Sequence, residues 1–482
     1  ESHGVGQGDR VIMHMNNSIE SFIAACSIPL SGAALVTSDV TLSEGELQDY
    51  ATNTGATHVL TDKTYFDIFK CLDPSLKFKK MFSVTEIPGF TAISKFDSKV
   101  SDYKEALGGY DSVMFVAHSN GTGGIEKIVE ISQRKYISQL RCREICEIAT
   151  SNDISLGGGN ISFKVCFTHA FFVLTIGGTL VLLDKYRPIP DVITALQDHK
   201  VTHIFGTPMK IFEISRELKR TGQTFPHVKK VITIGTPITQ LVKSEVLSAF
   251  SPIEIRSTYG MAEANGSLSA PPSGYITSCD VGFPVSNTRM KVLDITTKTV
   301  LGPNQTGEVL FHAPHLSAYY RTSTGTASVT DAEGWLHTGD LGYYNEDGVL
   351  FIMGRVKCAT LPSVIRTGLP AVEEWLHTHP SVAEAAVVPT FDSKGEAVLA
   401  AIIVARPEHR PSRTLSEDIK VFVEEGLPTA PCIQGGIFFA DAIPRSGFGK
   451  IKRYRLPQLM ASLERMDVRK NIKSRKVLIN DE

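Results

Sequence analysis

Short apolar runs alternate along the first part of the chain with stretches whose apolar residues recur at helical spacing. Apolar runs bounded by polar or glycine residues are typical of buried strands, and the stretches between them are typical of helices. The expected strands are residues 11–15, 33–36, 58–60, 80–84, 112–117, 179–183, 203–205, 230–234 and 254–256. Because strands and helices alternate, the pattern predicts an α/β fold of parallel sheets covered by helices.

Two serines are placed to cap expected helices, Ser18 before a helix through Phe22 and Ser132 before a longer one. The helix after Ser132 is expected to bury an apolar face formed by Ile137, Leu140, Ile145 and Ile148. Another helix is expected over residues 190–199.

The pattern changes after Gly282. Alternating strands at 290–295 and 306–311, separated by turn residues, suggest a small antiparallel, barrel-like unit. A compact α+β segment follows, with expected helices at 370–378 and 415–425 and expected strands at 384–389, 398–404 and 436–440. The expected organisation is a large N-terminal domain (1–353), a hinge (354–358), a small C-terminal domain (359–460) and a basic tail (461–482).

Composition narrows the class of protein. The chain has 482 residues, of which 42% are hydrophobic and 21% charged, and a net charge of −2, so nothing favours a nucleic-acid partner. The longest apolar run, 170–183, contains two glycines and is too short for a transmembrane segment, so it indicates buried helix or strand. Eight scattered cysteines without a CxxC pair indicate a reduced, intracellular protein. The last residues are not a Ser-Lys-Leu peroxisomal address, and the expected compartment is the cytoplasm or the peroxisome. The oligomeric state is not predicted.

A glycine-rich loop follows the expected strand 112–117. Its residues are Ser119, Asn120, Gly121, Thr122, Gly123 and Gly124, and it leads to Lys127. Glycines let backbone N–H groups approach an anion, and the lysine adds positive charge. Glu126 and Ile128 flank the lysine, where a P-loop NTPase needs glycine before it and serine or threonine after it. The loop predicts a cradle for a triphosphate, and a solvated glycine-rich hairpin is the alternative.

A second candidate segment is residues 257–263. Tyr259 can stack on an adenine ring, Gly260 permits close approach, and Glu263 can hold Mg²⁺ next to phosphates. The alternative is a core tyrosine beside a solvated glutamate.

Two further segments carry polar chemistry. Asp340 ends the string 334–340, and a carboxylate of this kind can accept both hydroxyls of a ribose, with Arg355 adding a second contact. Residues 444–450 form a glycine loop that delivers Lys450, which suits the stabilisation of charge on a transferred phosphoryl group. A turn aspartate with a surface arginine, and a basic surface turn, are the alternatives.

These ordered segments resemble the adenylate-forming superfamily of acyl-CoA synthetases, 4-coumarate–CoA ligases and beetle luciferases. The resemblance runs from Gly8 to Leu456. His169 and Phe171 match two positions of the His-His-Gly-Phe acceptor-site motif of the luciferase and coumarate-ligase branch. The turn formed by Gly235, Thr236 and Pro237 is similar to that branch's Gly-Ala-Pro adenine-pocket turn. Typical members are longer, so the N-terminal domain is expected to lack some N-terminal residues.

The resemblance implies an ATP-dependent acyl-CoA or aryl-CoA ligase. Such an enzyme forms an acyl-adenylate, releases pyrophosphate and transfers the acyl group to coenzyme A. It implies ATP, Mg²⁺, coenzyme A and a lipid-like or aromatic carboxylate as ligands, and catalytic roles for Lys450, Lys127 and His169. By position, the loop and Lys127 would hold the β,γ-phosphates, Lys450 the carboxylate and α-phosphate, Tyr259 the adenine, Asp340 and Arg355 the ribose, Glu263 the Mg²⁺, and His169 and Phe171 the acceptor.

The chain departs from the superfamily's motifs at positions that carry chemistry. The replacements are Asn120, Gly123, Glu126 and Ile128 in the loop, Ala262 in place of a threonine, and Cys358, Leu361, Val364 and Ala371 at the hinge and after it. They bear on phosphate binding and on the thioester-forming step. Three interpretations follow: an active ligase, an adenylating enzyme with a changed second step, and a member that binds nucleotide or acyl ligand without full turnover.

Overall fold

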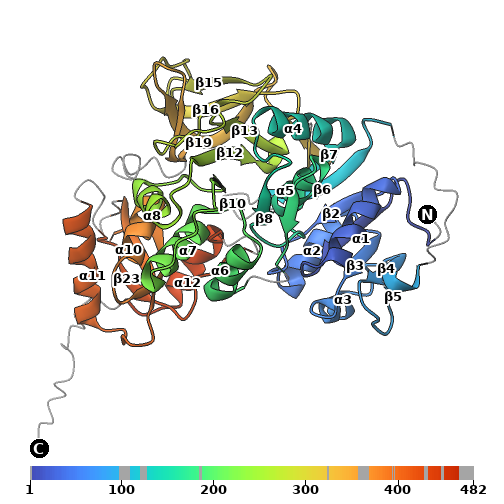
Figure 1. Cartoon of the computed structure of the whole chain (residues 1–482), viewed down its shortest axis with the longest axis horizontal. Helices are drawn as coiled ribbons and strands as arrows, with labels where there is room; N and C mark the ends of the chain where they lie inside the picture. Colours follow the sequence, from blue (N-terminus) through green and yellow to red (C-terminus); the bar gives the residue numbers. More distant parts are fainter. Residues whose placement is uncertain are drawn as a thin grey trace, which may run out of the picture. The chain divides into compact units, whose positions relative to one another are not determined.

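The computed structural model describes residues 3–96, 109–119, 127–183, 187–317, 319–322, 325–356, 369–392, 395, 397–427, 433–446 and 450–465. The chain forms two compact units, shown in Figure 1. The first comprises Glu1–Lys357 and Arg445–Lys452, and the second comprises Cys358–Pro444 and Arg453–Glu482.

A nine-stranded sheet forms the N-terminal part of the first unit. Its order is β18-β17-β7-β6-β2-β1-β3-β4-β5, with parallel pairing from β6 through β5 and antiparallel pairing from β6 through β18. The strands are β1 (Arg10–His14), β2 (Ala34–Thr37), β3 (His58–Thr61), β4 (Lys80–Ser83), β5 (Thr91–Ala92), β6 (Val113–Ser119), β7 (Lys127–Ser132), β17 (Tyr319–Thr322) and β18 (Gly325–Ser328).

Both faces of this sheet are buried. In β1, Val11 and Met13 lie in the core that includes α1 (Ile19–Leu30), whereas Ile12 lies in the core that includes α2 (Glu44–Thr54) and α3 (Phe66–Cys71). Successive side chains of a strand point to opposite faces, so a parallel strand covered on both sides is apolar throughout. Ser18 caps α1 as predicted, because its side chain accepts a hydrogen bond from the backbone N–H of Ser21.

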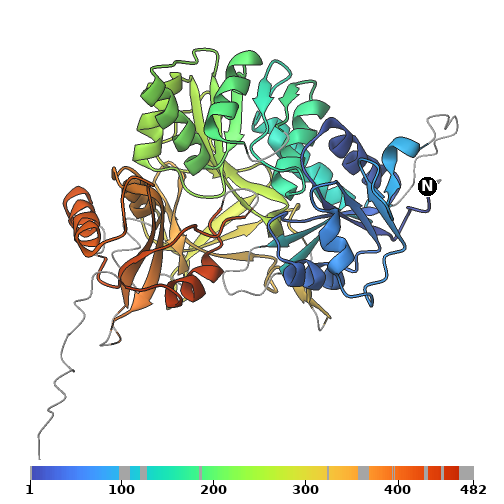
Figure 2. The same cartoon turned by 90° about the horizontal axis from the view of Figure 1, so that it is seen from below.

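A seven-stranded sheet follows, in the order β14-β13-β12-β11-β10-β8-β9, parallel from β9 to β12 and antiparallel beyond. Its strands are β8 (Ile154–Leu156), β9 (Thr179–Val181), β10 (His203–Gly206), β11 (Lys230–Ile234), β12 (Glu254–Met261), β13 (Gly266–Ala270) and β14 (Phe283–Pro284). Helices α6 (Ile189–Asp198), α7 (Pro208–Thr221) and α8 (Gln240–Phe250) share a core with its parallel strands, and Figures 1 and 2 show them side by side.

Two helices that precede β9 bear on the candidate site. They are α4 (Gln133–Ile145) and α5 (Lys164–Thr175). Cys166 of α5 packs with Phe205 and Ile232 of the seven-stranded sheet, which places α5 on the face opposite α6 to α8. The predicted α/β architecture with helix-covered parallel sheets is confirmed.

Antiparallel structure follows in the first unit, as expected. The strands β15 (Arg289–Leu293), β16 (Gly307–His312), β19 (Leu336–Tyr344) and β20 (Leu350–Arg355) form a four-stranded sheet in that order. The turn between β19 and β20 is closed by the backbone N–H of Asn345 donating to the carbonyl of Val349.

The second unit has a three-stranded sheet in the order β21-β22-β23. Its elements are α10 (Leu369–His377), β21 (Val382–Phe391), β22 (Ala397–Ala405), α11 (Arg413–Gly426), β23 (Gly436–Phe439), a 3-10 turn (Arg453–Arg455) and α12 (Leu456–Ala461). Val372 of α10, Ile419 of α11 and Ile403 of β22 belong to one buried core.

The structure overturns three expectations about these elements. Ser132 occupies the N-cap position of α4, but its side chain makes no capping hydrogen bond. Ile137 and Ile145 of α4 are 40% and 65% exposed, whereas Tyr136, Gln139 and Arg143 are buried. A helix face is buried by what packs against it, and here a partly polar face meets the protein interior. The expected strand 254–256 also continues to Met261, so Tyr259 and Gly260 lie within β12 and not after it.

Candidate active site

Asp340 and Arg355 are register partners on the antiparallel strands β19 and β20. The guanidinium Nε of Arg355 lies 2.9 Å from Oδ1 of Asp340, and Nη1 donates to the carbonyl of Thr338 at 3.0 Å. A tight hairpin therefore brings two residues that are separated in the sequence close enough to form an ion pair.

Tyr259 of β12 meets the same carboxylate. Its hydroxyl donates to Oδ2 of Asp340 at 2.6 Å, and its ring stacks on Phe311 with ring centroids 5.9 Å apart. Burial raises the pKa of Asp340, while Arg355, the Tyr259 hydroxyl and the charge of Lys450 act in the opposite direction. Burial and the neighbouring carboxylate raise the pKa of Tyr259 well above its ordinary value. Tyr259 therefore acts as a hydrogen-bond donor.

The loop that carries Lys450 belongs to the first unit. At the base of the loop, Arg445 and Ile451 form an antiparallel β-bridge. The backbone N–H of Ser446 donates a hydrogen bond to the carbonyl of Lys450 at 2.8 Å. The charge of Lys450 opposes the effect of burial on Asp340, although the pKa of that carboxyl is raised overall.

Glu263 lies just after β12, in the short 3-10 turn Ala262–Ala264. It is 5% exposed, and its Oε1 accepts a hydrogen bond from the hydroxyl of Tyr320 at 2.9 Å. The ammonium of Lys127 lies 4.3 Å from the centre of the same Tyr320 ring. One carboxylate next to a lysine suits Mg²⁺ bound largely through substrate phosphates, because Mg²⁺ keeps water and phosphate oxygens as its other ligands. Within the described residues, no group of three or more histidine, cysteine or acidic side chains is arranged to hold a metal ion.

The phosphate loop is visible only at its base. Ser119 at the end of β6 pairs with Lys127 at the start of β7. The remaining predicted loop residues, Asn120, Gly121, Thr122, Gly123 and Gly124, lie outside the described residues, as does Glu126.

The turn formed by Gly235, Thr236 and Pro237 begins where β11 ends. Ile234 pairs with Thr258 of β12, so Gly235 comes level with Tyr259. Gly235 has a φ of 99°, which favours glycine. Ligands of parallel α/β sheets bind beyond the carboxyl ends of the strands, where this turn lies. Gly260 was expected to let a ligand approach the backbone closely. In the structure its missing side chain makes room for the protein backbone instead, because an added Cβ would lie 2.0 Å from the carbonyl oxygen of Gly266.

His169 and Phe171 lie on α5. His169 is completely buried, with Nδ1 3.3 Å from Nη2 of Arg143 and Nε2 2.9 Å from the hydroxyl of Ser155. Arginine only donates, so Nδ1 accepts and Nε2 carries the proton. Burial lowers the pKa of His169 well below its ordinary value, so the ring is neutral. Phe171 stacks on Phe167 with centroids 6.0 Å apart. A neutral His169 with both nitrogens engaged holds Arg143 in place.

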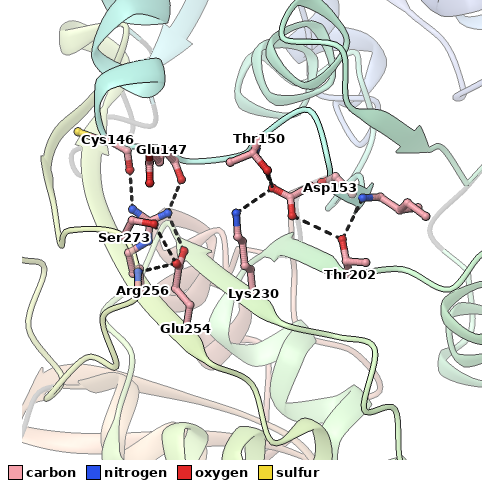
Figure 3. Close-up of polar contacts among 12 residues, drawn as sticks. Cys146, Glu147, Thr150, Asp153, Thr202, Lys230, Glu254, Arg256 and Ser273 are labelled. Carbon is pink, nitrogen blue, oxygen red and sulfur yellow. Dashed lines mark hydrogen bonds and ion pairs between the residues drawn. The ribbon is translucent and has the colours of Figure 1, made fainter.

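A buried ionic network that no sequence motif indicated supports β11 and β12 and is drawn in Figure 3. Arg256 is completely buried, forms an ion pair with Glu254 at 2.7 Å, and donates to the carbonyls of Cys146 and Glu147. Lys230 pairs with Asp153 at 2.9 Å. The apolar pattern that predicted these strands cannot show that charged residues point into the interior. The network stabilises β12, the strand that carries Tyr259.

The chain matches the AMP-binding enzyme family over residues 1–321 and the AMP-binding enzyme C-terminal domain over residues 371–450. The chain belongs to the AMP-binding enzyme family. The predicted resemblance to adenylate-forming enzymes is therefore confirmed, and within this family the chain is a divergent member.

Individual relatives match most of this chain at low sequence identity. It is 26% identical to 4-coumarate–CoA ligase 1 of Petroselinum crispum over 95% of the chain and 86% of the relative. It is 27% identical to luciferin 4-monooxygenase of Nipponoluciola cruciata over 82% of the chain and 69% of the relative. Among solved structures, the anthranilate CoA ligase AuaEII in complex with anthranoyl-AMP aligns with a TM-score of 0.80 at 19% identity, covering 95% of this chain and 89% of that one. A benzoate CoA ligase from Burkholderia xenovorans LB400 aligns with a TM-score of 0.77 at 18% identity, covering 94% and 90%. These structures share its fold.

No helix in the described part of this chain has the length and apolar character that crossing a membrane requires.

Proposed function

We propose that the chain is an ATP-dependent carboxylate–CoA ligase that works through an acyl-adenylate and releases pyrophosphate. The observation that carries the proposal is the convergence of Tyr259 and Arg355 on the buried carboxylate of Asp340, on which the charge of Lys450 also acts. The names of the relatives, 4-coumarate–CoA ligases among them, support this class of reaction.

The proposed ATP site follows from these contacts. Asp340 accepts one hydrogen bond on Oδ2 and an ion pair on Oδ1, and an ionised carboxylate has about four acceptor positions, so it can still accept ribose hydroxyls. The adenine would lie between Tyr259 and the turn at Gly235. Lys127 and the loop that begins at Ser119 would hold the β,γ-phosphates, with Glu263 as the protein ligand of Mg²⁺. When bound, Mg²⁺ would neutralise charge on those phosphates.

The chemistry would proceed in two displacements. A carboxylate oxygen of the substrate attacks the α-phosphorus of ATP, the bond to the bridging β-phosphate oxygen breaks, and pyrophosphate leaves. The ammonium of Lys450 stabilises the charge that develops on the α-phosphate and orients the carboxylate. The thiolate of coenzyme A then attacks the acyl carbon, the bond from that carbon to the phosphate oxygen breaks, and AMP leaves.

A second candidate function is a family member that binds nucleotide or acyl ligand without full turnover. Ala262, next to Glu263, has no hydroxyl for a phosphate, and a charge-assisted hydrogen bond of that kind contributes about 1.5–3 kcal/mol. In the second unit, Glu373 is buried and accepts hydrogen bonds from both terminal nitrogens of Arg453. That glutamate is thus part of the core of its unit, while the motif's other acidic position is Ala371.

The remaining expectations belong to the same proposal. The ligands are ATP, Mg²⁺, coenzyme A and a small carboxylate, with no nucleic acid. The proposed compartment is intracellular, in the cytoplasm or the peroxisome. The hinge at 354–358 stays a prediction, since Cys358 lies outside the described residues.

The test is pyrophosphate release from Mg-ATP across a panel of fatty and aromatic carboxylates, followed by addition of coenzyme A. Lys450→Ala is the test variant, and Lys63→Ala, at an exposed lysine, is the matched control. Release that depends on carboxylate and on Lys450 but not on Lys63 is the expected result. ATP binding without any release from the folded protein would refute the ligase and support the second candidate.

A further inference from the structure

Among the residues that the structure describes, no carboxylate pairs with a fully buried arginine of α4. Arg143 is 2% exposed, and its guanidinium faces the rings of Phe172 and Phe205, with its central carbon 5.4 Å and 5.6 Å from their centres. Nη2 meets the neutral His169, and Nε has no hydrogen-bond partner within the described chain. A buried charge without a counter-charge costs several kcal/mol, so the fold holds this guanidinium at a cost.

A second cation lies close by, at the start of α5. The ammonium of Lys164 donates to the carbonyl oxygen of Asn265 at 2.5 Å and, in the described part of the chain, has no acidic partner. Burial lowers the pKa of Lys164 to about 7, and the charge of Arg143 lowers it further. Asn265 is followed by Gly266, which lies against Gln139, one turn before Arg143 on α4. Both cations therefore border the same packed layer, where a bound anion would be attracted to both.

The side chains around these cations supply unused hydrogen-bonding groups. They come from α4, α5, β13 and its preceding turn, and the segment before β17. The atoms without a partner in the described chain are the amide of Gln139, the hydroxyls of Ser267 and Ser317 and Oδ1 of Asn265. The hydroxyls of Tyr136 and Thr168 face each other, and His315 meets the backbone of Ser267. Buried polar groups are nearly always hydrogen-bonded, so a cluster of this size on converging elements indicates a ligand.

This polar layer is continuous with the candidate active site. An added Cβ at Gly266 would lie 2.4 Å from Nε2 of Gln139, so that amide lies against the start of β13. The backbone N–H of Ser317 donates to the carbonyl of Glu263 at 2.8 Å, which ties the layer to the expected Mg²⁺ ligand. Phe171, expected in the acceptor pocket, contacts Tyr136 of the same layer with ring centroids 6.2 Å apart.

We propose that the acceptor end of the site recognises a carboxylic acid that carries a second carboxylate, which is held by Arg143 and Lys164. The inference rests on the proposed ligase function and narrows its substrate class, because an apolar acid would leave both cations and the surrounding donors uncompensated. One carboxylate reacts with ATP near Lys450, and the other is bound between α4 and α5. A guanidinium and an ammonium together supply the charge-assisted hydrogen bonds that a carboxylate accepts.

The test compares acids matched in length, hexanoate with adipate and benzoate with terephthalate. Ligand-induced change in melting temperature is measured without ATP, and kcat/KM for pyrophosphate release is measured with it. The wild type is expected to be stabilised by the diacids alone and to prefer them by at least about tenfold in kcat/KM. Arg143→Met and Lys164→Met are each expected to reduce the ratio of kcat/KM for a diacid to kcat/KM for its matched monoacid to about one.

Lys210→Met is the matched control. Lys210 is a half-buried lysine on α7 that has a carboxylate partner, Glu213, at 3.9 Å. Equal stabilisation and equal kcat/KM with mono- and diacids in the wild type would overturn the inference even if the variants do not fold. If the two variants lose kcat/KM to the same extent with monoacids and with diacids, Arg143 and Lys164 have a structural role only. Diacid binding without pyrophosphate release would retain this anion site and refute the ligase proposal instead.

Discussion

Replacing Tyr259 by phenylalanine tests how the buried carboxylate of Asp340 is stabilised. The change removes one hydroxyl, which donates to Oδ2 at 2.6 Å, and leaves the ring on Phe311. Asp340 is 8% exposed, so water cannot replace the lost donor freely. A hydrogen bond to a charged group contributes about 1.5–3 kcal/mol, and we expect a loss of that size in the free energy of unfolding of the first unit at pH 7.5.

Tyr344→Phe is the matched control on β19. Its hydroxyl donates to the neutral carbonyl of Leu301 at 3.3 Å, so we expect a loss of about 1 kcal/mol or less. The chain has two tryptophans, Trp335 in the first unit and Trp375 in the second. In a Trp375→Phe background, urea unfolding followed by fluorescence reports on the first unit through Trp335.

The loss should also depend on pH. The Tyr259 hydroxyl stabilises the ionised form of Asp340, so its removal raises further a pKa that burial has already raised. The loss in the free energy of unfolding is therefore complete at pH values above the folded-state pKa of Asp340 in both the wild type and Tyr259→Phe. It shrinks as the pH falls through those two pKa values, because a protonated carboxyl no longer needs the hydroxyl as a donor. A loss no larger than that of Tyr344→Phe, or one that is unchanged between pH 7.5 and pH 4, would refute this account.

Three other substitutions test charges inside the two units. Arg256→Met should cost about 3–5 kcal/mol in the Trp335 assay, because it leaves Glu254 buried without its partner, and a cost below 1 kcal/mol would contradict this. Lys164→Met should stabilise the first unit by a few kcal/mol near pH 6, since the lysine pKa falls to about 7 on folding. The gain should shrink above pH 7 and vanish only above about pH 11, where the unfolded lysine also loses its proton. A gain that does not vary with pH would argue against a buried charge. Glu373→Gln should lower the free energy of unfolding of the second unit by about 3 kcal/mol, because Arg453 loses its bidentate partner. Trp375 fluorescence in a Trp335→Phe background measures this loss. The control Glu425→Gln, at an exposed glutamate, should change it little.

Much of the candidate site could be predicted from the sequence because its residues stand in local motifs. Asp340 and Arg355 flank a turn that was recognisable from Asn345 to Gly348, and a hairpin brings its two strands together without any distant contact. Tyr259 and the turn at Gly235 follow expected strands that pair in parallel, so they share one edge of a sheet.

The charges inside the protein could not be predicted in the same way. Gln139 and Arg143 lie on a helix whose apolar residues suggested the opposite orientation, and α5 and β13 decide that the polar face is buried. Arg256 is ordinary in sequence and becomes buried only because the carbonyls of Cys146 and Glu147 lie within reach of its guanidinium.

The sequence by itself determined the order of strands and helices, the family and the residues expected around ATP, because periodicity and short motifs depend on neighbours along the chain. Only the tertiary structure decided that Tyr259 and Arg355 converge on Asp340 and that His169 is neutral and buried. It also decided that Arg143 is buried against His169 and that Lys164 meets the backbone of Asn265. Burial and electrostatic environment are properties of packing between distant segments, and no pattern along one segment contains them.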